Sequence, residues 1–371
     1  MLISKASEIY PNLLSYCRLK VLLSIASGIY GLVVLVRNWL FDRRILRSSA
    51  SRIPVVCVGN LTVGGAGKTP TVDWIIKFYQ REGKRVAVLS RGYKRKTKGV
   101  VLVCDGELVR VSAAEAGDEP LMLARRNPQA IVVVAEERLA GVRFIEEHFA
   151  PRLPDVIILD DGFQHRQLHR DLNLLVLHAE QNVFRDCLVP LGRLREPVQG
   201  IRRADLILLS KVTKYLELAP LLEGLRAFQK PVVQSQVKIV GLRSFFSSEL
   251  VPLGTQPFLY TWAFAFSGIG DPKNFMETLQ YAGLIVEHAK HFPDHHDYTA
   301  QDVEFILSEA VRHGSNIIVT TEKDFYRLKA KEELFNALRH APCFYLEIEF
   351  EMTAGQPVLE EALRRLVYCR D

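Results

Sequence analysis

VVCVGNLTVGGAGKTPTVDW, residues 55–74, is the most informative stretch of the 371-residue sequence. A β-branched run passes into a glycine-rich loop, and a lysine, a threonine and a segment with helical apolar spacing follow. Glycines allow successive backbone N–H groups to turn toward an anion, and the start of a helix adds partial positive charge. The stretch therefore predicts a strand, a phosphate-binding loop and a helix that together bind a nucleoside triphosphate.

The individual residues of this loop have different expected roles. Lys68 can reach the outer phosphates, and the hydroxyl of Thr69 can bind Mg²⁺. The loop departs from the usual pattern because Thr62 stands where a first glycine is expected. An ordinary glycine-rich turn is the alternative, and the buried-looking strand before it and the helix after it disfavour that interpretation. The residues expected to bind the nucleotide are Thr62, Val63, Gly64, Gly65, Ala66, Gly67, Lys68 and Thr69.

Composition sets broad limits on the class of protein. With 48% hydrophobic and 24% charged residues, the chain is globular and long enough for two domains. The net charge of +6 suits an acidic partner, either an anionic lipid, a nucleic acid or a phosphorylated ligand. A nucleic-acid partner is disfavoured because no aromatic and basic recognition module is present. The six cysteines are scattered without a C-x-x-C pair, so we expect neither a zinc site nor disulfides, and a reducing, cytoplasmic environment.

An uncharged apolar segment lies near the N-terminus, at Val21–Val36. It is slightly shorter than the roughly 20 residues that cross a bilayer comfortably. Bulky residues lie on one helical face and small residues on another, and basic and aromatic residues flank the segment. This pattern favours a helix that lies at the membrane interface or is partly inserted. A true span and a buried core helix are the alternatives.

Continuous β-branched runs, typical of parallel sheets buried on both faces, follow the phosphate loop. The run Val156–Leu159 ends at Asp160 and Asp161. A carboxylate at the end of a strand beside the phosphate-loop strand is the usual second ligand of Mg²⁺. We therefore expect Thr69, Asp160 and Asp161 to form a metal site. The other expected strands are Val86–Leu89, Ile131–Val134, Leu172–Leu177 and Leu206–Leu209, and Val100–Val103 with Glu107–Val111 form an expected β-hairpin.

Three further loops of the first half carry charged candidates. Arg91, in a basic loop after a strand, and Arg195, in Gly192–Pro197, can bind phosphate, and a solvated turn is the alternative for each. Asp118 comes just before a helix, where an acidic residue is most often an N-cap. The sequence after Leu209 reads SKVT and lacks the acidic residue of a guanine-reading loop, so GTPase signalling is disfavoured.

The second half contains a dense polar cluster, FPDHHDYT at residues 292–299. His295 and His296 can act in acid–base chemistry, bind a metal or have a structural role. Thr299 and Asp302 can cap the following helix. Lys323, at the end of the expected strand Ile317–Thr321, can contact phosphate or pair with a carboxylate.

The order of elements predicts an α/β fold. We expect a P-loop NTPase-type, mainly parallel sheet flanked by helices, a second smaller α/β lobe and an N-terminal membrane-associated helix. Composition changes after Phe228, where Pro231–Lys238 and Leu242–Ser248 form short extended segments, so we expect a hinge there. Phe258–Phe266 is the first expected strand of the second lobe. The expected boundaries are 1–44 for the membrane-associated segment, 45–228 for the nucleotide-binding lobe, 229–257 for the hinge or linker and 258–371 for the second lobe.

Seven motifs, taken with the basic-flanked N-terminal helix, resemble the tetraacyldisaccharide 4'-kinases of lipid A biosynthesis. The similarity covers nearly the whole chain, and Thr62 then matches the family's own form of the loop. The motifs are GNLTVGGAGKTP (59–70), SRGYKRK (90–96), GDEP (117–120), LDDGFQHR (159–166), GRLREP (192–197), FPDHHDY (292–298) and TTEKD (320–324).

The resemblance implies a kinase that uses ATP and Mg²⁺. It implies transfer of the γ-phosphate to the 4'-hydroxyl of a tetraacyldisaccharide 1-phosphate, giving lipid IVA, at the cytoplasmic face of the bacterial inner membrane. The implied partners are the lipid substrate and the membrane surface, with no nucleic acid and a monomeric enzyme. In such kinases an aspartate acts with a histidine, which implies Asp118 as the base and His295 as its partner, with His296 the alternative. Lys68, Mg²⁺ and Arg91 or Arg195 would neutralise phosphoryl charge.

Two rival functions follow from the residues. The first is a membrane-targeted P-loop ATPase that acts as a switch or chaperone, for which hydrolysis would not depend on a lipid substrate. The second is a nonenzymatic adaptor with a relic loop, which is hard to reconcile with the presence of Lys68, Thr69, Asp160 and Asp161 together.

Overall fold

The computed structural model describes residues 6–213, 215–247, 249–252 and 260–368. Its strands form one 13-stranded sheet, in the order β11-β10-β12-β13-β8-β7-β6-β1-β5-β2-β4-β3, with β9 paired to β8. The strands are β1 (Val55–Gly59), β2 (Val86–Ser90), β3 (Val101–Asp105), β4 (Ile131–Val134), β5 (Val156–Asp160), β6 (Leu172–His178), β7 (Leu206–Ser210), β8 (Val232–Ser244), β9 (Leu250–Pro252), β10 (Trp262–Ser267), β11 (Ile285–His291), β12 (Ile317–Thr321) and β13 (Cys343–Ala354).

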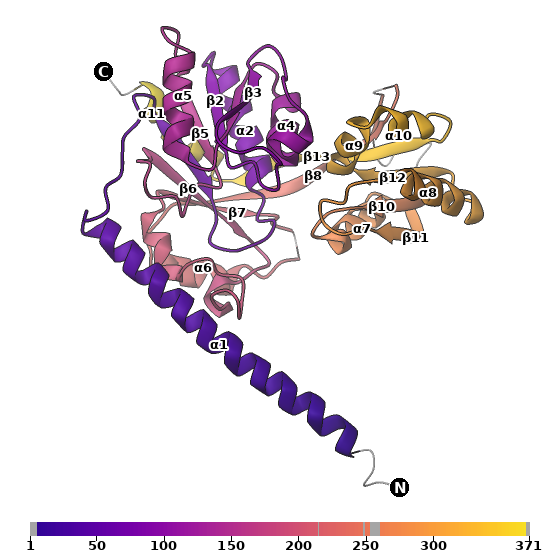
Figure 1. The fold of residues 1–371 in the computed structure, drawn as a ribbon, viewed down its shortest axis with the longest axis horizontal. Helices are drawn as coiled ribbons and strands as arrows, with labels where there is room; N and C mark the ends of the chain where they lie inside the picture. Colours follow the sequence, from indigo (N-terminus) through magenta and orange to yellow (C-terminus); the bar gives the residue numbers. More distant parts are fainter. Residues whose placement is uncertain (1–5, 214, 248, 253–259, 369–371) are drawn as a thin grey trace.

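The helices cover this sheet and extend from it (Figure 1). They are α1 (Ala6–Asp42), α2 (Lys68–Arg81), α3 (Ala113–Ala116), α4 (Asp118–Arg126), α5 (Arg138–His148), α6 (Ala219–Arg226), α7 (Pro272–Tyr281), α8 (Ala300–Arg312), α9 (Glu322–Lys329), α10 (Glu332–Ala337) and α11 (Gln356–Tyr368), with 3₁₀ turns η1 (Val183–Arg185) and η2 (Val198–Arg203).

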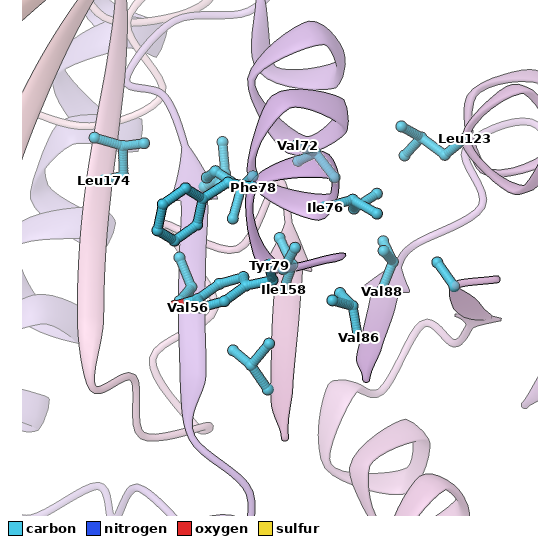
Figure 2. Close-up of a cluster of buried hydrophobic side chains, with 14 of the residues drawn as sticks. Val56, Val72, Ile76, Phe78, Tyr79, Val86, Val88, Leu123, Ile158 and Leu174 are labelled. Atoms are coloured by element: carbon cyan, nitrogen blue, oxygen red, sulfur yellow. The ribbon is translucent and has the colours of Figure 1, made fainter. Parts of the chain in front are cut away.

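The first lobe is built around β1, as the sequence predicts. β1 lies between β5 and β6 and is parallel to both, and its five residues are buried. Its side chains pack with those of α2, β2 and β5 in one core, which includes Val56, Ile76, Phe78 and Ile158 (Figure 2). Burying each large apolar side chain contributes about 1.5–3 kcal/mol, so this core fixes the position of the loop between β1 and α2.

The edge of the first lobe differs from the predicted hairpin. Val101–Asp105 forms β3, which pairs antiparallel with β4. Of the predicted second arm, Val109 makes an isolated bridge to Cys104. The Arg110 N–H also donates to the Val103 carbonyl at 2.8 Å, so the two predicted arms do pair across the turn, over a short length. The prediction missed the longer pairing of β3 with β4, a buried strand that offers more hydrogen bonds and apolar contacts than the exposed segment after Gly106.

The second lobe contains β10, β11 and β12 with α7 to α10 around them, and two long antiparallel strands connect it to the first lobe (Figure 1). These strands are β8, which pairs with β7 in the first lobe, and β13, which pairs with β12 in the second. The predicted extended segments of the 229–257 region thus merge into one strand, and its role as a hinge stays a prediction. Residues 248 and 253–259, which include the predicted start of the second lobe, lie outside the described residues.

The last helix, α11, returns to the first lobe. Leu359 and Leu363 are fully buried in the core that surrounds α2. The hydroxyl of Tyr79 donates a hydrogen bond to the carbonyl oxygen of Leu363 at 2.9 Å. Helix α11 therefore packs outside the second lobe to which the predicted boundary 258–371 assigns it, because its apolar face covers the side of the sheet beside α2.

Helix α1 extends well beyond the predicted apolar segment and projects from the body of the protein (Figure 1). Its part Leu19–Asp42 is long and apolar enough to cross a membrane, and only 17% of that part is buried. One face of this part packs on the first lobe: Ser27 Oγ donates to the Leu188 carbonyl at 2.9 Å, Tyr30 OH donates to the Arg195 carbonyl at 2.7 Å, and Val34 is buried. The bulky face remains exposed, which contradicts the alternative of a buried core helix.

Candidate functional site

The phosphate-loop residues lie between the end of β1 and the start of α2. Gly64 and Gly67 have φ of 101° and 83°, a region that favours glycine, and Gly67 is the N-cap of α2. Ser210 Oγ, at the end of β7, donates to the Ala66 carbonyl at 2.7 Å, so a neighbouring strand supports the loop. Backbone N–H groups at the start of α2 are therefore available to an anion.

Thr62, the unusual residue of the loop, is buried and paired with another segment. It forms an antiparallel bridge with Leu194, and the Val63 N–H donates to the Arg193 carbonyl at 2.8 Å. Asn60 Nδ2 also donates to the Thr62 carbonyl at 2.7 Å. A β-branched residue suits this extended pairing, which ties the loop to the segment that carries Arg195.

The two aspartates after β5 have different surroundings. Asp160 is buried and accepts a hydrogen bond from Ser90 Oγ at 2.9 Å. Burial, with the negative charges of Glu119 and Asp161, raises the pKa of Asp160 to about 6. Asp161 lies 3.6 Å from Lys68 Nζ and accepts hydrogen bonds from Arg195 Nη1 at 2.9 Å. Burial acts to raise the pKa of Asp161, but these two cations outweigh it and lower the pKa.

The different surroundings of Asp160 and Asp161 indicate which of them suits Mg²⁺. β5 pairs with β1 in a register that places Asp160 beside Val58, so Asp160 and Thr69 lie at the same edge of the sheet. Asp160 is a buried carboxylate short of positive charge, and oxygen ligands are those that Mg²⁺ prefers. Among the described residues no group of three or more His, Cys, Asp or Glu side chains could hold a metal, and Mg²⁺ sites with substrate phosphates use few protein ligands. The donor set therefore fits Mg²⁺, with Asp160 better suited than Asp161.

We expect replacement of Asp160 by Asn to stabilise the magnesium-free protein at high pH. Because the folded-state pKa is raised, the destabilising effect of Asp160 is absent below the unfolded pKa near 4 and grows as pH rises through about 6. The shift of about two units corresponds to roughly 3 kcal/mol at pH 8. Urea unfolding in a chelator between pH 5 and pH 8 measures this.

The matched control for that prediction is Asp161→Asn. This change leaves Lys68 and Arg195 without their shared carboxylate, so it lowers the free energy of unfolding at the same pH values. Equal effects of the two substitutions would contradict the assignment of different charge environments.

Arg91 follows β2 and is exposed. Its charge belongs to a positive region around His165, where burial first and then the charges of Arg138, Arg170, Arg91 and Arg37 lower the pKa of the histidine to about 4. The structure therefore places Arg195 beside Asp161. Arg91 instead belongs to the group of positive charges that surrounds His165.

Asp118 and His295, which are far apart in sequence, lie together between the lobes. His295 Nδ1 is 2.8 Å from Asp118 Oδ2. Arg327, on α9, donates to the same carboxylate oxygen from Nε at 2.8 Å. Burial acts to raise the pKa of Asp118, but the hydrogen bond with His295 and the charge of Arg327 outweigh it and lower the pKa to about 2. Asp118 is therefore ionised at neutral pH.

The local backbone explains how these two side chains are presented. Asp118 is the first residue of α4, and Gly117, not Asp118, is the N-cap, so the N-cap interpretation is wrong. Asp118 is free to point at the second lobe because its side chain caps no backbone group of α4. His295 has φ of 62°, a sparsely populated region for a residue with a side chain, and its N–H donates to the Gly268 carbonyl at 3.0 Å.

His296 faces a different partner. Its Nε2 is 3.0 Å from Asp302 Oδ2, and Asp302 forms the predicted capping box of α8 with Thr299. Its ring stacks on Phe292 at 4.6 Å between centroids. These contacts give His296 a role at the start of α8.

Several residues of the site were missed by sequence reasoning. Arg327 contacts both Asp118 and His295, and Ser90 binds Asp160. Glu119 accepts a hydrogen bond from Lys323 at 2.6 Å, so Lys323 pairs with a carboxylate, one of its two predicted alternatives. The usable signal for Arg327 was its helical spacing, three residues after Asp324 and four after Lys323, which places it on the same face as the TTEKD motif.

Comparison with known proteins gives a consistent result. The family model described as Tetraacyldisaccharide-1-P 4'-kinase (LpxK) matches residues 19–368. A tetraacyldisaccharide 4'-kinase of Chlorobaculum parvum is 48% identical over 92% of this chain and 93% of its own length. That of Chlorobaculum tepidum is 47% identical over 92% of this chain and 96% of its own. A crystal structure of LpxK from Aquifex aeolicus in complex with ATP is similar with a TM-score of 0.73 and 33% identity, covering 94% of this chain and all of that one.

Proposed function

We propose that Asp118 and His295 form the catalytic pair of this protein. The chain belongs to the tetraacyldisaccharide 4'-kinase family and is therefore a lipid A 4'-kinase that uses ATP. The enzyme transfers the γ-phosphate of ATP to the 4'-hydroxyl of a tetraacyldisaccharide 1-phosphate and forms lipid IVA. The family match disfavours a nucleotide switch or chaperone. One observation supports the pair above all: an ionised carboxylate of the nucleotide-binding lobe lies 2.8 Å from a histidine of the second lobe.

The proposed chemistry follows from these positions. The loop residues 62–69 hold the triphosphate through backbone N–H groups, and Lys68 neutralises charge on the outer phosphates. Asp118 accepts the hydroxyl proton as the sugar oxygen bonds to the γ-phosphorus and the bond to the ADP oxygen breaks. His295 orients the carboxylate and shares its charge. The two lobes together align the reactants and exclude water, which limits hydrolysis of ATP.

Thr69 and Asp160 are the residues that we propose to hold Mg²⁺, with Asp161 paired to Lys68 and Arg195 beside them. When bound, Mg²⁺ neutralises negative charge on the phosphate oxygens. Arg195 and Arg91 are proposed phosphate ligands, and the Arg195 N–H donates to the Leu61 carbonyl at 2.7 Å, just before the loop. One chain supplies both Lys68 and His295, so we propose that the enzyme acts as a monomer.

A direct assay tests the proposed function. Detergent-solubilised protein is incubated with γ-labelled ATP, Mg²⁺ and a tetraacyldisaccharide 1-phosphate. The expected result is label on the lipid, with label transfer lost in Asp118→Asn and His295→Ala variants. Label found solely as inorganic phosphate would overturn the kinase function, whereas near-normal transfer by both variants would overturn the catalytic pair alone.

We further propose that α1 places the enzyme on the cytoplasmic face of the inner membrane. Several bulky apolar side chains of its outer face are more than half exposed, for example Leu22 at 64% and Ile29 at 62%, and Trp39 follows at 52%. The opposite face is fixed to the first lobe by hydrogen bonds from Ser27 and Tyr30. No described part of the protein covers the apolar face of α1. Such an exposed apolar face suits contact with a lipid surface.

We expect a triple substitution of Ile25, Ile29 and Leu32 by Asp to reduce binding to anionic phospholipid vesicles by at least about 100-fold. Each buried side chain contributes about 1.5–3 kcal/mol to partition into lipid, and the new charges add a penalty. Vesicle co-sedimentation measures the partition. The control is Leu108→Asp, an equally exposed apolar position near the edge of the first lobe. Equal vesicle binding by the triple variant and the native protein would contradict the anchor.

A further inference from the structure

Arg327 connects the candidate catalytic pair to the interior of the second lobe. Its side chain is 9% exposed, and its three nitrogen atoms each have a partner. Nε donates to Asp118 Oδ2 at 2.8 Å, and Nη2 lies 2.7 Å from the same oxygen and 3.3 Å from His295 Nδ1. Nη1 donates to the Gly268 carbonyl at 2.6 Å and to Asp324 Oδ1 at 2.8 Å. The planar guanidinium is thus held on both sides.

Asp324 is the fixed end of this arrangement. It is fully buried and accepts hydrogen bonds from the Gly268 N–H at 3.0 Å and from Thr321 Oγ1 at 2.7 Å. Thr321 is the N-cap of α9, and its Oγ1 accepts a hydrogen bond from the Asp324 N–H at 3.2 Å, so the position of Asp324 is set by the fold of the second lobe. Arg327 is therefore oriented before it meets Asp118.

The two carboxylate oxygen atoms of Asp118 differ in their contacts. Within the described residues, the side-chain contacts from His295 and Arg327 are all made to Oδ2. A carboxylate oxygen engaged by a guanidinium and an imidazole is a poor proton acceptor, because both partners stabilise its negative charge. Oδ1 takes no part in these contacts with His295 and Arg327.

We propose that Arg327 is a positioning residue, which fixes Asp118 by Oδ2 and directs Oδ1 to the hydroxyl that is phosphorylated. The proposal rests on the proposed roles of Asp118 and His295. Since Asp118 belongs to α4 and Arg327 to α9, the carboxylate is aligned only when these two helices are in contact. Arg327 thereby makes proton acceptance depend on the arrangement of the lobes.

Two other ion pairs join the same helices and provide a comparison. Lys323 on α9 binds Glu119 on α4, and Arg126 on α4 binds Glu322 on α9 through Nε at 2.8 Å. Arg126 is also 3.5 Å from Asp73. Arg126 thus contributes to docking of the helices at the far end of α4, away from Asp118, and a variant of it separates docking from positioning.

The test compares Arg327→Met, Arg327→Lys and Arg327→Ala with Arg126→Met in the full-length enzyme. Loss of Arg327 is expected to lower kcat about 10- to 100-fold while KM for ATP changes by less than about twofold, because the loop that binds ATP is untouched. The pKa of Asp118 rises when the positive charge is removed, so the acid limb of the kcat profile moves to higher pH. The other charged groups near Asp118 are unchanged in all of these variants: His295 is retained, and so is Asp294, whose carboxylate lies 3.7 Å from His295 Nε2.

Three further results are expected. The Arg327→Lys variant is expected to retain part of the activity. Guanidinium chloride at low concentration is expected to restore part of the activity of Arg327→Ala. The Arg126→Met variant is expected to have the same pH profile of kcat as the native enzyme. If Arg327→Met fails to fold because Asp324 loses its counter-ion, the double variant Arg327→Met/Asp324→Asn replaces it, since the buried charge is then also removed.

Native-like kcat for Arg327→Met would overturn the proposal. So would a loss of activity with an unchanged pH profile and no response to guanidinium, or a pH shift of equal size in Arg126→Met. Asp118→Asn is measured alongside: if it loses activity while Arg327→Met does not, the positioning role fails and the catalytic pair stands. If Asp118→Asn retains activity, the catalytic pair itself fails.

Discussion

Replacement of Lys68 by Met is expected to reduce phosphoryl transfer about 10³-fold or more. The Lys68 side chain is 12% exposed and directly follows the glycine loop, and its ammonium group is the cation that we propose to meet the outer phosphates. A group that stabilises charge on a transferring phosphoryl loses its full effect when it is made apolar, and comparable deletions cost 10²–10³-fold or more. Initial rates with γ-labelled ATP and the lipid acceptor measure the loss.

The control for Lys68→Met lies on the same helix. Lys77 is 48% exposed and pairs with Asp73 four residues earlier, so Lys77→Met is expected to keep native activity. Asp161 retains Arg195 as a partner when Lys68 is removed, so the variant is expected to fold. Retention of more than about a tenth of native activity by Lys68→Met would contradict the proposed role, since so small a loss is worth only about 1.4 kcal/mol.

The parts of the site that could be predicted are those encoded by continuous sequence. The strand, loop and helix around Gly67 form from neighbouring residues, and the β-branched run before Asp160 predicts a buried parallel strand that ends there. The pairing of β5 with β1 agrees with the prediction that the strand ending in the two aspartates lies beside the phosphate-loop strand. The distinction between Asp160 and Asp161 was not predictable, since it depends on Ser90, Glu119 and Arg195 from three other segments.

The parts that could not be predicted depend on contacts across the chain. Asp118 and His295 are separated by 177 positions, and residue type alone favoured an N-cap for the first and left acid–base, metal and structural roles open for the second. The family resemblance brought them together, whereas Arg327 belongs to no quoted motif and emerged only from the geometry. In the same way, the return of α11 to the first lobe is set by the surface beside Tyr79, which no local pattern describes.

Asp118→Asn is expected to lower kcat by about 10²–10⁴-fold with little change in KM for ATP, because it removes the proton acceptor but keeps the size and shape of the side chain. The pKa of Asp118, lowered to about 2, makes the carboxylate ionised throughout pH 6–9, so the loss is expected to be the same at each pH in that range. Single-turnover measurements with saturating ATP give the chemical step directly.

His295→Ala and His296→Ala sharpen this prediction, because the two histidines are adjacent and differ only in what they contact. His295 binds the Asp118 carboxylate, so its loss is expected to lower kcat by about 10²-fold. His296 binds Asp302 at the start of α8, so its loss is expected to cost about 1 kcal/mol of folding free energy, measured by urea unfolding, and to leave kcat near native. Equal losses of kcat in the two variants would contradict the selection of His295. A loss confined to His295 and Asp118 would show that proton acceptance requires one residue from each lobe, so that phosphoryl transfer proceeds only while α4 and the FPDH loop are in contact.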